Sequence, residues 1–578
     1  MMKNQLFQAA LMGAMLLFAG HLPQLSAQVA QSAEQLNKEV EVVKPYTPDV
    51  ADVRKISRLP RITDTVWVRP SFGYSLLTGV APSVYRPMAA SPVKIAPPEL
   101  PALYKGFARI GAANYASPLV ELFLHSGRSD SREFGASVRH ASSFGKIKPA
   151  EGVKQRAPFG TTSIEGFARG YRPISTLSAD AGFSHQFVSY YGVNPLMFST
   201  DPPTIEMPLS TGKIGQHYWK GWLSGALQSR PRQGFNYLLS LQSSMLNDKF
   251  GYFENVSKMA FLLGSSSSKL DWGVEGDVEI FLRNKDFEPM PRQMQNYSLV
   301  PYFRIRNEEI DLKAGVRTTL AGAEGDHKFY LFPKVNLDLL LGGPSLHIFG
   351  ILGGGVQTNS YTSIVEKNPF VYPGQITGNS IEYLDALAGI RGEVGSVFQF
   401  RFGVGYAIWK DYLFFANIDA PEQINTWADN AFVPVLDDVN RFMASGEFSV
   451  TWTDFLSSVV GGNVYHWDTD RLPFAPHMPD WDLSLAVKYQ YDNRFFATLQ
   501  TTAMGERTGF SVRSFDGLNT PKLPLDSEID LNLLLKYQLN NRFGLFLNGY
   551  NLSNQKHYLW NFFPSQGVQI QGGVTITF

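Results

Sequence analysis

Few residues in this chain have the types and spacing that catalysis needs. His140 is followed by Ser142 and Ser143, the combination of base and nucleophile that a hydrolase uses. This pairing is one of sequence only, and the metalloprotease, nucleophile-elbow and P-loop motifs are absent from the sequence. The ten histidines are scattered without metal-ligand spacing. We therefore expect no enzyme activity, no cofactor and no metal site.

Large aromatic residues could instead bind a ligand or a partner. They gather in segments that we expect to connect strands at one end of the fold: Tyr190, Tyr191, Phe198, Phe370, Tyr372, Phe414, Phe415, Trp427, Phe432 and Trp560. Tyrosine and tryptophan at strand ends are also typical of a membrane interface. Residues deep in a long connection, such as Trp427 and Phe432, are better explained by loops that pack on one another or by a docked partner.

The composition restricts the class of protein that positions these residues. Charged residues make up 18% of the 578 and hydrophobic residues 44%, which excludes a disordered chain. Lysine plus arginine and aspartate plus glutamate balance at 51 each, so no basic field exists for nucleic acid. Cysteine is absent, which excludes disulfides, thiolate sites and a lipid-modified cysteine. Beyond the N-terminus, no uncharged apolar run reaches the roughly 18 residues of a membrane-spanning helix.

Residues 104–578 alternate between apolar and polar side chains with a period of two. In the last segment, Ile570 and Val574 share one face, and glutamine, glycine and threonine occupy the other. The same alternation recurs in 272–280, 442–452 and 481–491. Many such segments of ten or more residues are typical of antiparallel strands that cross a membrane with their apolar face outward.

The connections between these segments alternate between short and long. Short ones include 172–173, 307–309 and 540–542, and long ones include 191–214, 359–378, 411–440 and 552–565. Outer-membrane barrels have this asymmetry, with short periplasmic turns and long external loops. The sequence therefore predicts an all-β protein of the bacterial outer membrane: a transmembrane antiparallel β-barrel of about 22 strands with an extended N-terminal segment.

The polar face of the predicted strands carries several carboxylates: Glu275, Asp277, Glu279, Asp482 and Asp530. Because such a barrel turns its polar face toward the lumen, we expect these side chains to line it. We also expect them to pair there with Lys488 and Lys536 rather than to act as catalytic acids or bases.

The C-terminal residues resemble a known family. The stretch 545–554 reads L-F-L-N-G-Y-N-L-S-N and precedes a loop and a last strand that ends in Phe578. This resembles the closing strands of TonB-dependent receptors, and 42–50 is similar to the start of receptor-like barrels of Bacteroidota that lack an evident full plug domain. The resemblance implies a 22-strand barrel, and a terminal aromatic such as Phe578 resembles the outer-membrane insertion signal.

The N-terminal residues divide into two predicted parts. Residues 1–27 have the pattern of a signal peptide, so we expect an exported protein. Residues 28–103 are rich in proline, which removes the backbone donors that helix and sheet need, and we expect an extended periplasmic or lumenal segment. Its basic arm could meet lumenal or partner carboxylates, or remain a solvated face: Arg54, Lys55, Arg58 and Arg61. Within it, 39–43 could be read as the strand offered to periplasmic TonB.

Three functions remain open on these grounds. We favour a receptor-like barrel that passes or binds a ligand across the outer membrane. The alternative is a non-transporting structural subunit of an outer-membrane assembly or export complex, which the short N-terminal segment favours. The third function is an open diffusion porin, which fits least because porins usually have only about 16–18 strands. The expected partners are outer-membrane lipid and a protein, which could be a periplasmic energising protein, a surface lipoprotein or an assembly complex.

Overall fold

The computed structural model describes residues 104–148, 155–192, 215–230, 234–284, 292–323, 325–341, 345–418, 431–512 and 523–578. Several predictions lie outside these residues. They concern the signal peptide, the proline-rich segment, the loop residues Phe198 and Trp427, and the arm residues Arg54, Lys55, Arg58 and Arg61.

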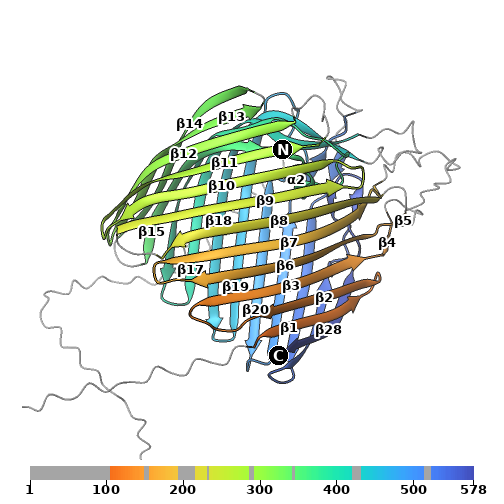
Figure 1. The fold of residues 1–578 in the computed structure, drawn as a ribbon. Helices are drawn as coiled ribbons and strands as arrows, with labels where there is room; N and C mark the ends of the chain where they lie inside the picture. Colours follow the sequence, from red (N-terminus) through yellow and green to blue (C-terminus); the bar gives the residue numbers. More distant parts are fainter. Residues whose placement is uncertain are drawn as a thin grey trace, which may run out of the picture. The chain divides into compact units, whose positions relative to one another are not determined.

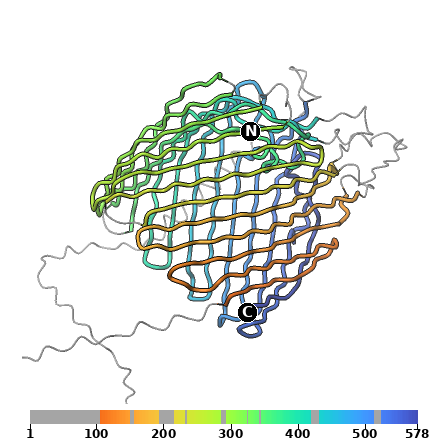
Figure 2. The backbone as a smooth tube through the Cα atoms, in the orientation of Figure 1, coloured from red at the N-terminus to blue at the C-terminus, as the bar shows by residue number. Residues whose placement is uncertain are grey.

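Twenty-two strands form one antiparallel sheet that closes on itself, because β1 pairs with both β2 and β28. Figure 1 shows the closed wall, and in Figure 2 the orange first strand lies beside the dark blue last strand. The predicted barrel is confirmed. Its strands are β1 (Gly106–Ala113), β2 (Ser117–His125), β3 (Arg132–Ser143), β6 (Phe159–Tyr171), β7 (Ser175–Ser189), β8 (Gly215–Ser229), β9 (Gly234–Asp248), β10 (Phe253–Ser266), β11 (Leu270–Arg283), β12 (Gln293–Arg306), β13 (Ile310–Ala323), β14 (Asp326–Leu340), β15 (Leu346–Thr358), β16 (Asn379–Val394), β17 (Phe398–Asn417), β18 (Phe432–Thr453), β19 (Leu456–Thr469), β20 (Trp481–Tyr491), β21 (Phe495–Met504), β24 (Glu528–Gln538), β25 (Phe543–Tyr550) and β28 (Gln569–Thr577).

The remaining elements are short and lie in the connections. They are the strand pairs β4 (Lys146–Ile147) with β5 (Gln155–Arg156), β22 (Arg507–Gly509) with β23 (Leu523–Leu525), and β26 (Tyr558–Trp560) with β27 (Phe563–Pro564), and the helix α2 (Tyr361–Lys367). Among the described residues, no helix is long and apolar enough to cross a bilayer.

The predicted apolar alternation faces outward. On β28, Ile570 is 45% exposed while its neighbour Gln571, on the lumenal face, is 9% exposed. Exposed leucine, valine and phenylalanine side chains recur at alternate positions on strands all round the wall. An exposed apolar belt of this extent is stable only in lipid, so the chain is an outer-membrane barrel.

Long connections lie at one end of the barrel, which we call the loop end, and short turns lie at the other, the turn end. In outer-membrane barrels the long connections face the outside of the cell. At the turn end, Gly106 and Phe578 close the wall. The N–H of each donates to the carbonyl of the other, at 2.8 and 2.9 Å.

One predicted loop is wrong in its extent. We expected a single connection over 411–440, but β17 continues to Asn417 and β18 begins at Phe432. Their pairing continues through Asn417↔Phe432, so the hairpin extends beyond the predicted strand ends. The apolar run 413–416 is buried against other loops, and this burial stabilises strand where an exposed loop was predicted.

Three neighbouring strands bend near the loop end. β15, β16 and β17 each carry a register shift, between Gly353 and Gly355 in the first of them. A bulge of this kind bends its strand. Beyond the bend, Thr358 Oγ1 accepts a hydrogen bond from Asn296 Nδ2 of β12 at 2.6 Å. The end of β15 therefore lies against the inner face of β12, inside the barrel.

Candidate functional site

A hydrophobic cluster, which we call the cap, covers the loop end of the barrel. It consists of side chains from 188–191, 361–376, 413–415, 432 and 560–563, packed on Tyr218 and Leu246 of the wall. These segments follow strands on different sides of a closed barrel, so they can meet only by spanning its mouth. The helix α2 lies within the cap. Ser360 stabilises the start of this helix, because its Oγ accepts a hydrogen bond from the Ser363 N–H at 3.1 Å.

A buried ion pair anchors the cap to the wall. Glu254 Oε1 on β10 lies 3.0 Å from Arg283 Nε on β11, and both side chains are 0% exposed. The same carboxylate accepts the backbone N–H groups of Tyr361 and Thr362 at 3.1 and 2.8 Å. It also accepts the Thr362 hydroxyl at 2.8 Å. One wall residue thus holds the first turn of α2.

Asp248, at the end of β9, forms a second anchor. Its Oδ2 accepts the Tyr361 hydroxyl at 2.7 Å and the Gln216 amide at 3.1 Å. Its Oδ1 accepts two backbone N–H groups of the following turn, from Phe250 and Tyr252, at 2.9 and 2.8 Å. Burial, followed by the Asp248 charge, raises the pKa of Tyr361 well above its ordinary value, so this phenol stays a neutral donor.

The aromatic residues singled out in the sequence meet in the cap. Phe370 and Phe563 have ring centroids 4.3 Å apart, and Tyr191 lies 5.1 Å from Phe563. Phe432 lies 5.5 Å from Trp560. Phe415 packs against Trp560 in the same cluster. Tyr190 and Tyr372 lie in an adjoining cluster with Ala431, and Phe414 lies in a third cluster with Val439. The interpretation that loops pack on one another describes this arrangement.

His477 is buried beside the cap in the connection between β19 and β20. Its Nε2 donates to Asn561 Oδ1 at 2.7 Å, and its ring lies 5.0 Å from Trp560. Burial lowers the pKa of His477 to about 4, so the imidazole is neutral at physiological pH.

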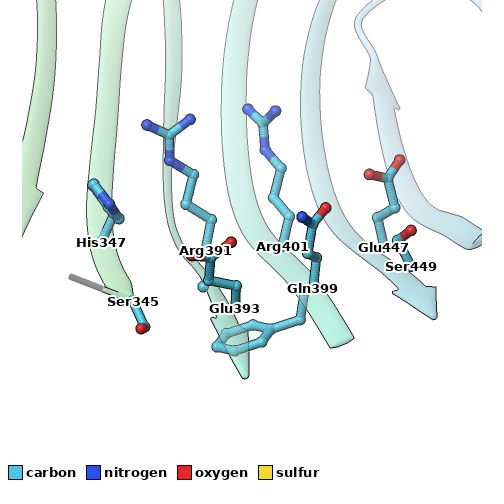
Figure 3. A pocket seen from close by; sticks show the side chains of 10 residues that line it. Ser345, His347, Arg391, Glu393, Gln399, Arg401, Glu447 and Ser449 are labelled. Carbon is cyan, nitrogen blue, oxygen red and sulfur yellow. The ribbon is translucent and has the colours of Figure 1, made fainter. Parts of the chain in front are cut away.

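A second feature lies on the lumenal wall at the turn end. A cavity of about 430 Å³ is lined by His347, Arg391 and Arg401, which face one another in register on β15, β16 and β17. Figure 3 shows the two guanidinium groups pointing the same way from neighbouring strands. Asp338 pairs with Arg391 and, at 2.6 Å, with His347, while Arg401 lies 4.6 Å over the Phe349 ring. Glu393 and Glu447 line the same cavity, and Glu447 stands directly opposite Arg401 in the ladder. The two arginines are therefore balanced by carboxylates, and the cavity offers both hydrogen-bond donors and acceptors.

The expected lumenal carboxylates line the barrel, but the prediction that they pair with Lys488 and Lys536 is wrong. Asp482 accepts from the Asn463 amide at 2.9 Å and Asp530 from the Asn532 amide at 2.7 Å, and the three carboxylates of β11 have other cations. Glu275 pairs with Lys313 and, at 2.7 Å, with Lys334. Asp277 pairs with Arg317 and Glu279 with Lys258, at 3.5 and 2.6 Å. Cations on nearby strands β10, β13 and β14 reach these carboxylates, whereas Lys488 and Lys536 lie on β20 and β24. Spacing along the chain does not reveal these cross-strand neighbours.

The structure also corrects the reading of His140. Its Nε2 lies 3.0 Å from Ser142 Oγ and its Nδ1 2.8 Å from Thr162 Oγ1, so the pairing is real in space. Ser142 is nevertheless buried, and the Phe187 ring lies on Gly160 directly opposite it. A substrate carbonyl has no approach to the Ser142 hydroxyl in this arrangement.

Solved structures of similar fold are known. The ferric-catecholate import receptor Fiu of Escherichia coli K12 is 9% identical, with a TM-score of 0.60 over 83% of this chain and 82% of that chain. The ferric enterobactin receptor PfeA of Pseudomonas aeruginosa, in complex with enterobactin, is 12% identical, with a TM-score of 0.59 over 83% and 82%. The siderophore receptor PirA of Acinetobacter baumannii is 9% identical, with a TM-score of 0.60 over 83% and 81%. The fold is that of a TonB-dependent receptor barrel. No protein-family model and no curated protein matches the sequence.

Sequence reasoning missed the residues that anchor the cap of this receptor-like barrel. Glu254 and Arg283 stand at strand ends 29 residues apart, and no local pattern marks them as a pair. α2 was expected as part of a loop, although Ser360 before an apolar turn is a recognisable helix start. Phe578 is exposed and paired at the end of the wall, where an insertion signal would be accessible, and that role stays a prediction. So does ligand or partner binding by the aromatic loop residues.

Proposed function

We propose that this protein is a gated outer-membrane barrel that binds or passes a ligand, in the manner of the receptors whose fold it has. The supporting observation is the cap: a packed core of loops across the mouth, fixed at Glu254 and Asp248. A 22-strand barrel of this class encloses a lumen that has to be blocked. The cap supplies a barrier at the loop end, and its attachment by a few buried contacts allows it to open as a unit.

The lumenal row of His347, Arg391 and Arg401 supports ligand passage or binding from the other end. Arg391 and Arg401 lie with Glu393 and Glu447 around a cavity at the turn end, where a polar ligand group with both donors and acceptors could be held. The proline-rich segment 28–103, whose position lies outside the described residues, is our candidate for the element that communicates with the periplasm.

Conductance in planar bilayers tests the gate. Intact protein should pass little current, and deletion of 360–376 should open large steady currents because the cap loses its central segment. Deletion of 146–156 is the matched control and should leave the current low, because the described residues of this loop-end connection are not part of the cap cluster. Large steady currents from the intact protein would support an open pore instead.

A non-transporting subunit of a larger assembly is the second candidate. It is favoured by the burial of the loop aromatics in the cap, since side chains that pack on one another are not displayed to a ligand. Val42→Pro separates the two, because proline blocks the strand addition by which TonB would pair with 39–43. Loss of energised uptake with unchanged barrel levels supports the receptor. An unaffected cell, with a partner that co-purifies in fixed ratio under mild detergent, supports the subunit.

A further inference from the structure

The β14 strand has a partner on both sides for only part of its length. It pairs with β13 from Asp326 to Leu339. On its other side it pairs with β15 only from Val335 to Leu340. Within the described part of the chain, the edge of β14 over 326–334 therefore has no strand beside it.

The hydrogen-bond pattern identifies which groups face this open edge. The Leu340 N–H donates to Glu309 at 2.7 Å on the β13 side, and the Leu341 N–H donates to Leu346 at 2.8 Å on the β15 side. Antiparallel pairing alternates along a strand, so odd-numbered residues of β14 turn their N–H and C=O away from β13. Phe329 and Leu331 thus present backbone groups that pair with no other strand described in the structure. Pro333, which has no N–H, stands where the β15 ladder ends.

The cause lies in β15. Its bulge at Gly353 to Gly355 turns it inward, and a Cβ on Gly354 would meet the ring of Phe332 at 2.8 Å. Beyond this point β15 runs beneath the wall to reach Asn296, and it covers the inner face of Phe332, which is buried. The inner face of the β13–β14 hairpin is therefore sealed while its edge stays open.

The outer face beside the edge is apolar. Phe329 is 63% exposed and Leu331 60% exposed, both pointing outward. Next to them, where the ladder resumes, lies an outward groove of about 420 Å³ lined by Val335, Leu352 and Ala388 among other apolar residues. About 9–11 residues of a tilted strand cross the membrane, so counting back from Leu340 places Leu331 at the outer limit of the span and Phe329 two residues farther out. A row of unpaired N–H and C=O groups at a sheet edge is a ready template for pairing with another chain.

We propose that the β14 edge accepts an extended strand from another polypeptide, antiparallel to β14, with apolar side chains at alternate positions facing the membrane. The added strand would continue the ladder that β15 leaves and would seat its apolar side chains along the groove. Because the edge lies at the loop end, the partner reaches it from the outer surface or from within the outer leaflet. This is strand addition, in which main-chain hydrogen bonds give affinity and alternate side chains give specificity.

A second copy of this chain does not fit the edge. Two copies in one membrane are related by an axis along the membrane normal, and that rotation keeps both strands running in the same direction. Two β14 edges would then meet as parallel strands. The outer, apolar face of one strand would lie on the same side as the lumenal face of the other. The occupant is therefore a different polypeptide.

Photo-crosslinking in native membranes tests the proposal. A photoreactive amino acid in place of Phe329 should crosslink to a protein, and mass spectrometry should map the adduct to a segment with alternating apolar residues. The same group in place of Leu223, which is outward and 63% exposed on the fully paired strand β8, should crosslink at least tenfold less to protein. Adducts at Phe329 with lipid only, or with residues 1–103 of this chain, would overturn the proposal.

A backbone substitution gives an independent reading. Leu331→Pro removes an N–H that faces only the open edge, so the barrel should form while the Phe329 crosslink falls at least tenfold. Tyr330→Pro, one residue away, removes an N–H used by β13 and should impair the barrel itself. If Leu331→Pro left the protein crosslink unchanged, strand addition would be wrong. If the Leu331→Pro protein does not reach the membrane, the comparison of crosslinking at Phe329 and at Leu223 decides whether a strand is added.

Discussion

Glu254→Ala should loosen the cap while leaving the barrel wall intact. The substitution removes the carboxylate partner of Arg283 and, at once, the acceptor of the Tyr361 and Thr362 N–H groups. The pairing of β10 with its neighbours uses backbone groups and is not affected. The expected change is therefore confined to α2 and the segments that pack on it.

The size of the effect follows from the burial of the pair. Removing one partner of a buried ion pair costs about 3–5 kcal/mol. Since each 1.4 kcal/mol is a factor of ten in an equilibrium, the open population of the cap should rise by about two to three and a half orders of magnitude. Glu279→Ala is the matched control, because Lys258 and Glu279 are 49% and 23% exposed, and such a pair contributes less than about 1 kcal/mol.

Amide hydrogen exchange measures this directly. In the Glu254→Ala protein, the amides of 361–367 should lose protection by that factor, while those of β10 and β11 keep theirs. The control should change exchange in α2 by less than about fivefold. A change in α2 below fivefold for Glu254→Ala as well would refute the conclusion that this ion pair holds the cap.

Three further outcomes are expected. Leu223 points outward near the middle of β8, so Leu223→Arg should destabilise the barrel by about 2–4 kcal/mol. Ser224→Arg on the lumenal face should cost much less. Urea unfolding in detergent or lipid measures the stability of both variants. His477 has its folded-state pKa lowered from 6.5 to about 4, so the unfolded cap binds the proton more readily and cap stability should fall by about 3 kcal/mol as the pH drops from 6.5 to 4. In exchange experiments, His477→Gln should abolish this dependence, and an unchanged dependence would assign it to another group. In a barrel opened by deleting 360–376, Arg401→Glu should shift the reversal potential toward cation selectivity, and no shift would place Arg401 away from the ion path.

The barrel could be predicted because its signals are local. The alternation of Ile570 with Gln571 follows from the two faces of a strand, and the turns at 172–174 and 307–309 carry their own sequence signature. The site could not be predicted in the same way. The contacts of Glu254 with Arg283 and with the first turn of α2 depend on which loop folds inward, and the chain separation of 107 residues to Tyr361 carries no pattern. The prediction of a loop over 411–440 failed for the same reason, because burial in the cap and in the adjoining cluster around Phe414 stabilises strand there.

The pairing of the first barrel strand with the last sets the order in which this protein can be made. The Asn114 side chain donates to the Val568 carbonyl at 2.8 Å across 454 residues, whereas every other ladder of the wall joins strands that follow one another along the chain. Bringing such distant residues together costs about 5 kcal/mol in loop-closure entropy if the chain between them is flexible, and far less once the intervening hairpins are in place. Closure through β1 and β28 therefore costs least after the intervening hairpins have formed. Until then the sheet has two open edges, so loss of β28 should leave β1 and β25 each without a strand on one side.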